Sequence, residues 1–462
     1  MNPDAKVLCG QFEIHWDDLV AALMMWKKEL DIAPLHQRAF LKAMHLAEFR
    51  DRFSVKKEPI SLLNAMRWSH QTMATDPRDK IFGLLGLCHD GDTLVPLPNY
   101  KQPLEEIITD MSKRMMSLNR SLDLMCFKGT SLSNTKLPSW TPNWMNLWSG
   151  SFNSMTIHEM KFLDRHSIFP FDPVLEGSAG QILKVKGKQS GRVCQLSSEL
   201  TQLSSDGRLN LSIGPPAHWI TSTSSLAEKH PPLDKAKEDD LTTRNTIWQT
   251  LTMGLLPPEM TAEAAAFCFS KLWTPEGRGA VHNLALIDWI DRNAWLSYGN
   301  WTLWEWSQMK APPSSPPASS NVGSGQFLGG DRSQSKNQRI AETHKTENTV
   351  EQLIAFIDTL EHILKSGMRL AVVSGHGTLG KDYIGMVLSN ARTSDQVWHI
   401  RGCSVPILLR KIDRIDCQTR HEVIGAMYLH DAKKWFGLEE KWIRGEEGHS
   451  ALVRIPEVLN LC

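Results

Sequence analysis

The residues with the clearest potential for chemistry lie in the stretch RLAVVSGHGTLGKDY, residues 369–383. Gly375, Gly377 and Gly380 have the G-x-G-x-x-G spacing of dinucleotide-binding turns, and Lys381 follows the last glycine as in a phosphate-binding loop. An apolar run precedes them, as a strand does in both kinds of site. Either a nucleotide site or a glycine-rich turn could account for this stretch.

The residues around these glycines fit neither nucleotide motif. A phosphate loop needs a Ser or Thr hydroxyl after the lysine to bind Mg²⁺, and this chain has Asp382, whose carboxylate would repel phosphates. A dinucleotide site needs a following helix and an acidic residue at the end of the next strand. Residues 383–392 could form a short helix, but Gly385 weakens it, and Asp395 begins the next apolar run. The sequence favours a connection between strands, with a nucleotide site as the alternative.

The composition narrows the class of protein. Lys+Arg and Asp+Glu both number 51 in 462 residues, so no overall positive charge favours nucleic acid. No apolar run approaches the ~18 residues of a membrane-spanning helix, and no signal-peptide pattern opens the chain. The eight cysteines form no C-x-x-C pair, which disfavours a zinc ribbon. We expect a cytoplasmic protein with no membrane segment, metal, cofactor or nucleic-acid partner.

Tryptophan is unusually frequent, with 17 residues against 4 tyrosines. The indole rings gather at Trp140, Trp144 and Trp148, and again between residues 289 and 306. Each ring buries a large area while its N–H seeks a hydrogen-bond partner. Core packing is the simpler interpretation, and a Trp-lined groove that binds a peptide is the alternative.

The hydrophobic periodicity predicts an α+β fold with a mainly helical N-terminal half, a helical middle with short strands, and a β-rich C-terminal region. Helical spacing of apolar residues occurs in 16–31, 35–49, 59–71, 100–116, 243–254, 260–272, 281–296 and 347–364. Strand-like runs occur at 122–127, at 181–196 as two strands or one bulged strand, and at 369–374, 395–400, 405–412 and 421–430.

Composition shifts divide the chain into four regions. Residues 1–150 are helical and residues 151–310 mix helices with strands. Residues 311–346 are low in complexity and expected to be disordered. Residues 347–462 form a helix followed by the β-rich region.

The stretch ATDPRDKIFGLLGLC, residues 74–88, predicts the start of a helix. Asp76 can accept a backbone N–H as the N-cap, Pro77 suits the first helical position, and Asp79 suits the third. Apolar residues then surround the helix, which is typical of a helix buried on most sides. Among Asp76, Pro77, Arg78 and Asp79, this structural interpretation explains Arg78 least.

Several segments, taken in order, resemble the fungal heterokaryon-incompatibility (HET) domain family. Residues 74–87 are similar to the most recognisable downstream signature of that family, which includes Asp76, Pro77, Arg78 and Asp79. The stretch LPSWTPNW, residues 137–144, is similar to its tryptophan-proline segment through Trp140 and Trp144. Residues 395–411 resemble its C-terminal β region through Gly402, Pro406 and Arg410.

The resemblance implies a role in nonself recognition and regulated cell death. Family members carry an upstream block with Ser-Tyr-x-Trp-Gly and Cys-Ile-Asn-Gln type elements, which this sequence lacks. We therefore expect residues 1–150 to be the C-terminal remnant of a truncated HET domain. The implied action is through contacts with other incompatibility proteins and without catalysis.

Overall fold

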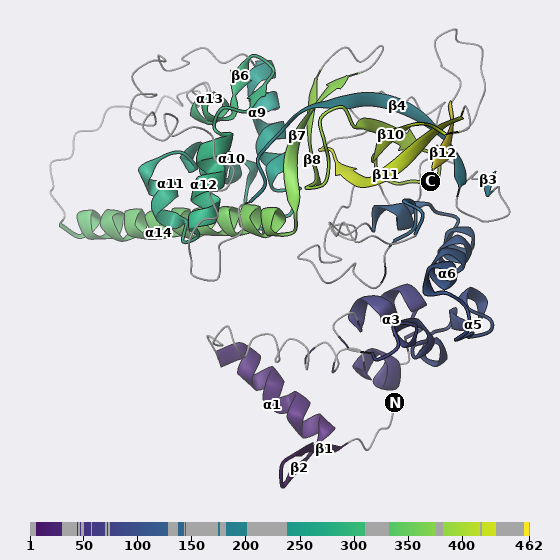
Figure 1. Cartoon of the computed structure of the whole chain (residues 1–462). Coiled ribbons are helices and arrows are strands. Elements are labelled where there is room, and N and C mark those ends of the chain that lie inside the picture. Colours follow the sequence, from purple (N-terminus) through teal and green to yellow (C-terminus); the bar gives the residue numbers. More distant parts are fainter. Residues whose placement is uncertain are drawn as a thin grey trace, which may run out of the picture. The chain divides into compact units, whose positions relative to one another are not determined.

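The computed structural model describes residues 6–29, 44, 47, 50–56, 58–69, 72, 74–127, 137–142, 144, 174–175, 182–200, 238–309, 332–375, 382–415, 418–430 and 457–461 (Figure 1). Most of the predicted helix 35–49 lies outside these residues, as do Trp148, Gly377, Gly380 and Lys381. The chain divides into two compact units. The first consists of Met1–Ser154 with Gly177–Gln181, and the second of Met155–Glu176 with Ile182–Cys462.

The first unit combines one hairpin with short helices. β1 (Lys6–Cys9) and β2 (Phe12–His15) pair antiparallel ahead of α1 (Trp16–Glu29). The later elements are η1 (Asp51–Val55), α3 (Leu62–Trp68), α4 (Asp79–Phe82), η2 (Leu85–Leu87), α5 (Gly91–Leu94), α6 (Leu104–Asn119) and η3 (Asp123–Cys126). The helices predicted at 16–31, 59–71 and 100–116 are confirmed.

Residues 74–88 do not form the single buried helix that their apolar content predicted. α4 spans one turn, and the 3₁₀ turn η2 follows it. Only Ile81 and Leu85 are buried among the apolar residues of this stretch. Gly83 and Gly86 explain the interruption, because glycine loses the most backbone entropy in a helix.

Residues 122–127 form the 3₁₀ turn η3 and not the predicted strand. The apolar side chains are nevertheless buried, at Leu122, Leu124, Met125 and Cys126. A short apolar run fits a buried strand and a buried helical turn equally well, so its periodicity could not separate the two.

The second unit contains a closed barrel. Its strands are β4 (Leu183–Leu196), β7 (Met368–Gly375), β8 (Tyr383–Leu388), β9 (Gln396–Ile400), β10 (Ile407–Ile415) and β11 (Gln418–Tyr428). Around the ring, β4 pairs with β7, β7 with β8, β8 with β11, β11 with β10, β10 with β9, and β9 with β4, always antiparallel. The β-rich C-terminal region is therefore confirmed, and the α+β class with it.

The barrel interior is a packed apolar core. Its members are Val193, Ala371, Val373, Tyr383, Val387, Ala391, Val397, Leu408, Ile424, Met427 and Leu429. β4 reaches both of its ring neighbours because it bends. Its register shifts beside Ser190 and beside Cys194, which confirms the bulged strand predicted at 181–196.

Two further strands pair with strands of this ring, and one of them lies between β4 and β11. β12 (Glu457–Leu461) pairs antiparallel with the first half of β4 and parallel with the start of β11. β3 (Val174–Leu175) pairs with β4 at Lys184 and Leu183.

Helices pack beside the barrel in the second unit (Figure 1). They are α9 (Glu238–Leu251), α10 (Ala262–Lys271), α11 (Pro275–Ala280), α12 (Leu284–Asn293), α13 (Leu303–Gln308) and α14 (Arg332–Lys365). The small hairpin of β5 (Ser297–Tyr298) and β6 (Trp301–Thr302) precedes α13. α9 contacts β8 and α14 contacts β7, so these two helices join the helical layer to the barrel.

The helix starts follow from local sequence. The side chains of Thr261, Thr274, Asn283 and Thr302 each accept a backbone N–H as an N-cap, and Glu305 completes a capping box with Thr302. α14 begins at Arg332, inside the segment whose composition suggested disorder, and residues 332–346 are helical. That part of the segment contains Arg, Gln, Lys and Glu residues, which favour a helix.

The tryptophans of both units pack into cores. Trp140 and Trp144 are buried in the first unit, and Trp289 and Trp306 in the second. Core packing is therefore confirmed for these four residues, and they do not line an open groove. Among the described residues, no helix has the length and apolar character needed to cross a membrane.

Candidate functional site

The four motif residues of the first unit form a turn that leads into α4. α4 begins at Asp79 with Arg78 as its N-cap, so the predicted N-cap at Asp76 and first helical position at Pro77 are wrong. Asp76 Oδ1 accepts from Arg78 N at 2.9 Å and so closes a turn one residue ahead of that N-cap. Asp79 is the first residue of α4 and not the predicted third, and a carboxylate there suits the positive end of the helix.

Arg78 is the centre of a network of polar contacts. Its Nε donates to Asp76 Oδ1 at 2.9 Å and its Nη2 to Asp76 Oδ2 at 2.8 Å. Its Nη1 donates to the backbone oxygens of Tyr100 and Gln102. The guanidinium carbon also lies 5.5 Å from the centroid of the Tyr100 ring. Arg78 therefore fastens the 76–79 turn to the segment that enters α6.

Tyr100 closes the network on its other side. Its hydroxyl donates to Asp79 Oδ1 at 2.5 Å, and its ring meets Phe82 edge-on at a centroid distance of 5.1 Å. Sequence reasoning missed this residue, which lies far along the chain from Asp79. Only the rarity of tyrosine in the chain could have drawn attention to it.

The electrostatics of this network do not prepare a group for proton transfer. The hydrogen bonds from Arg78 lower the pKa of the Asp76 carboxyl, and the same contact raises the pKa of Arg78. The hydrogen bond to Asp79 raises the pKa of the Tyr100 hydroxyl. Each change moves the pKa further from neutrality, whereas a general acid or base works best near the ambient pH.

An open depression of about 520 Å³ lies beside the network, lined by Thr75, Asp76, Pro77, Arg78 and Leu104. The charges of Asp76 and Arg78 neutralise each other within it. The depression can therefore contact a polar surface by hydrogen bonds, and it presents no strong field of either sign.

The tryptophan-proline segment packs against α6 in the same unit. Trp144 Nε1 lies 3.4 Å from Ser112 Oγ, and its ring lies 6.2 Å from that of Phe127. Trp140 is fully buried. The turn between them is held by backbone hydrogen bonds, which agrees with the irregular structure that Pro138 and Pro142 impose.

Gly402, Pro406 and Arg410 belong to the second unit, in and around β10. Gly402 has φ of 87°, a left-handed conformation that favours glycine in the turn after β9. Pro406 O accepts from Met427 N at 2.8 Å and so joins the entry of β10 to β11.

Arg410 forms a bidentate ion pair with Asp395. Its Nε donates to Asp395 Oδ1 and its Nη2 to Asp395 Oδ2, both at 2.8 Å. Asp395 also accepts from Arg392 N at 2.7 Å, and only 2% of its side chain is exposed. Asp395 is therefore a structural partner of Arg410 that fixes the turn before β9, and not a ribose-binding acid.

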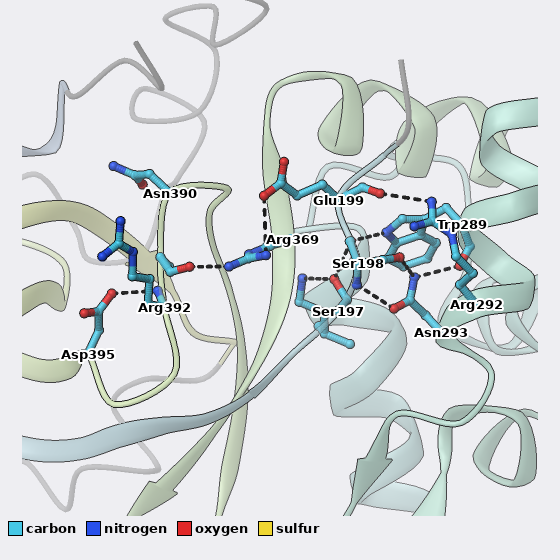
Figure 2. A network of polar contacts seen from close by, with 12 residues as sticks. Ser197, Ser198, Glu199, Trp289, Arg292, Asn293, Arg369, Asn390, Arg392 and Asp395 are labelled. Carbon is cyan, nitrogen blue, oxygen red and sulfur yellow. Dashed lines mark hydrogen bonds and ion pairs between the residues drawn. The ribbon is translucent and has the colours of Figure 1, made fainter. Parts of the chain in front are cut away.

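A second buried network joins the barrel to the helical layer (Figure 2). Asn293, near the end of α12, accepts from Ser198 N at 2.8 Å and donates to Ser198 Oγ at 2.7 Å. Trp289 Nε1 donates to Ser198 O at 2.8 Å. Ser197 in turn exchanges two hydrogen bonds with the backbone of Leu370 in β7. Ser197 and Ser198, which follow β4, are thus hydrogen-bonded to β7 and to α12, respectively.

This network continues toward the turn that holds Asp395. Arg369 Nη1 lies 3.5 Å from Glu199 Oε1, and Arg369 Nη2 donates to Ala391 O (Figure 2). Sequence reasoning did not single out Ser198, Asn293 or Arg369, because their hydrogen bonds join segments far apart in the chain. The contacts form one structural connection from α12 to the barrel.

The glycine-rich stretch joins two antiparallel strands. β7 and β8 pair in register from Met368↔Leu388 to Val373↔Tyr383. Residues 383–388 are thus a strand and not the short helix that a dinucleotide site would need there. In β8, a Cβ on Gly385 would lie 2.3 Å from Tyr428 O, so glycine is needed for close strand packing. A nucleotide site at Gly375 would lack the helix that both motifs require. No cluster of possible metal ligands occurs within the described part of the chain.

Comparisons with known proteins give one partial similarity. Heterokaryon incompatibility protein 6, OR allele, of Neurospora crassa is 31% identical over 103 residues. The match covers 19% of this chain and 15% of that protein. No family model matches the chain, and no solved structure matches it. The chain is thus an α+β protein with a distant, partial similarity to an incompatibility protein.

Proposed function

We propose that this chain is a heterokaryon incompatibility-type protein that acts in fungal nonself recognition and regulated cell death. The observation that carries the proposal is the partial similarity to an incompatibility protein of Neurospora crassa. The ordered motifs of the sequence, above all Asp76 to Asp79, support the same assignment.

The proposed action is through protein contacts in the cytoplasm, without catalysis. The motif residues support this part of the proposal by their partners. Asp76, Arg78, Asp79 and Tyr100 bind one another, and the pKa values of Asp76, Arg78 and Tyr100 move away from neutrality. Such a network holds a recognition surface in a fixed shape.

Expression of the full chain in Neurospora crassa tests the proposal. The host strains are one that carries the OR allele of the relative and one from which that gene is deleted. We expect slower growth and more dye-permeable, dead hyphal compartments in one strain than in the other. Equal growth and viability in both strains would count against the proposal.

Two variants make this test specific for the network. Arg78→Ala removes the contacts to Asp76, Tyr100 and Gln102, and we expect it to abolish the growth effect. Lys80→Ala removes a positive charge from the same short segment without touching those contacts, and we expect it to behave like the unmodified chain. Protein levels are compared by immunoblot, so that loss of effect is not confused with loss of protein.

A further inference from the structure

A second hollow, of about 420 Å³, lies in the first unit where α5 packs against α6 (Figure 1). Thr93 of α5 lines it together with Lys113, Arg114, Ser117 and Leu118 of α6. Lys113 and Ser117 are four residues apart, as are Arg114 and Leu118, so these side chains occupy one patch of the helix surface. None of the lining residues belongs to the depression beside Arg78.

Core packing holds both walls of this hollow in place. Leu94, which follows Thr93 in α5, is buried in the core. Met115 and Met116, which lie between the lining residues of α6, are buried as well. The lining side chains therefore project from backbone whose position is fixed, and binding a ligand there orders little of the chain.

The lining of the hollow offers hydrogen-bond donors that the fold does not use. Within the part of the chain that the structure describes, the Arg114 guanidinium and the hydroxyls of Thr93 and Ser117 make no hydrogen bond or ion pair. Lys113 Nζ lies 3.7 Å from Asp110 Oδ1, and the Asp110 side chain is largely exposed. An exposed pair of this kind contributes little to stability, so Lys113 is available to a ligand at small cost.

The charges around the hollow favour an anion. Lys113 and Arg114 do not serve the helix dipole, because the dipole acts within the last turn and that turn of α6 has no basic side chain. Arg120, which ends α6, adds a further positive charge two residues beyond Leu118. The carboxylates of Asp92, next to Thr93, and of Asp110 moderate this field. The hollow therefore suits a single anionic group and not a polyanion.

We propose that this hollow binds a phosphorylated tyrosine side chain of a partner protein. A phosphate monoester has three terminal oxygens, which can accept from the Arg114 guanidinium, the Lys113 ammonium and the two hydroxyls together, whereas a carboxylate has only two oxygens. The hollow is larger than a phosphate group alone, and Leu118, which is 50% exposed, offers an apolar wall to an aromatic ring. The inference goes beyond the proposed function and does not depend on it.

Peptide binding to the full chain tests the proposal by fluorescence anisotropy. The probes are a short labelled alanine–glycine peptide with one central phosphotyrosine and the same peptide with phosphoserine or with unmodified tyrosine. We expect the phosphotyrosine peptide to bind at least about tenfold more tightly than the tyrosine peptide, because charge-assisted hydrogen bonds are the strong ones. It should bind about threefold more tightly than the phosphoserine peptide, because its ring contacts Leu118. Inorganic phosphate should displace it, and added salt should weaken it.

Three chain variants locate the binding in this hollow. Arg114→Gln removes the guanidinium and should weaken phosphotyrosine-peptide binding at least about tenfold. Lys101→Gln is the matched control, because it removes an exposed cation of the same unit outside the hollow, and it should change binding less than about twofold. Leu118→Ala should abolish the preference for phosphotyrosine over phosphoserine and leave displacement by inorganic phosphate unchanged. All three side chains are exposed, so each variant should fold, and circular dichroism checks this.

Three results would each overturn the proposal. Equal binding of the phosphotyrosine and tyrosine peptides would refute the phosphate chemistry. Unchanged binding to the Arg114→Gln variant, or an equal loss in Lys101→Gln, would show that the phosphate does not bind in this hollow. A preference for phosphotyrosine over phosphoserine that survives in Leu118→Ala would refute the contact between the ring and the apolar wall.

Discussion

The ion pair between Arg410 and Asp395 allows a sharp test of how the second unit is held together. Arg410→Met keeps most of the apolar stem of the side chain and removes the guanidinium. Asp395 would then remain 2% exposed without its cation, although Arg392 N would still donate to it. A buried charge without a partner is costly because it has lost its hydration.

The expected loss is about 3 kcal/mol, at the lower end of the ~3–5 kcal/mol measured for breaking buried pairs. The lower end applies because 22% of the Arg410 side chain is exposed and because the Arg392 N–H remains. The folded-to-unfolded ratio would fall by about two orders of magnitude. With a urea dependence of about 2 kcal/mol per molar, the unfolding midpoint would fall by about 1.5 M.

Urea denaturation followed by circular dichroism measures this loss. Lys411→Met, an exposed neighbour on β10, is the matched control and should change stability by less than about 0.5 kcal/mol. Adding Asp395→Asn to Arg410→Met removes the buried charge and should restore at least half of the loss. If Arg410→Met costs no more than Lys411→Met, the ion pair does not have the structural role assigned to it.

Three further predictions address other parts of the chain. Asn293→Ala removes the acceptor of Ser198 N and the donor to Ser198 Oγ, so it should cost about 2 kcal/mol in urea denaturation, and a loss below about 0.5 kcal/mol would contradict the role of this network. Burial, and to a lesser degree Lys188, lowers the pKa of His399 to about 3, so the folded protein holds this ring neutral where the unfolded chain protonates near pH 6.5. The stability from His399 is therefore complete above about pH 6.5 and is lost as the pH falls toward 3. Between pH 7 and pH 4.5 the unmodified chain should lose about 2.7 kcal/mol through this group, and His399→Gln should not show that loss. Titration calorimetry with ATP and with NAD should show no binding heat, because residues 383–388 form a strand paired with β7 where a nucleotide site needs a helix. Saturable heat that Lys381→Ala abolishes would refute this.

Some features of the molecule could be predicted because they depend on neighbouring residues. The helices at 16–31 and 100–116, the bulged strand at 181–196 and the C-terminal strands all follow from local periodicity. The turn hydrogen bond from Arg78 N to Asp76 is local in the same way, since donor and acceptor lie two residues apart, although the helix begins later than predicted. Short apolar runs were harder, and 122–127 was assigned to a strand where the structure has a 3₁₀ turn.

The role of Arg78 in joining two segments could not be predicted, because its partners beyond Asp76 are backbone oxygens at Tyr100 and Gln102. The same holds for Asn293 with Ser198 and for Arg410 with Asp395, whose contacts bring together segments far apart in the sequence. No local pattern encodes which distant residue a long polar side chain will meet. Such contacts are fixed only when the surrounding elements pack.

The glycine-rich stretch at 375–381 shows most clearly which features depend on the local sequence and which depend on tertiary packing. The sequence by itself determined the spacing of the glycines and the acidic Asp382 that argues against a phosphate loop. Only the tertiary structure decided that the residues on either side are paired strands of a closed barrel. The physical reason is that a strand is stabilised by hydrogen bonds to other strands, so residues 383–388 became β8 through pairing with β7 and β11 and not through their own helical propensity.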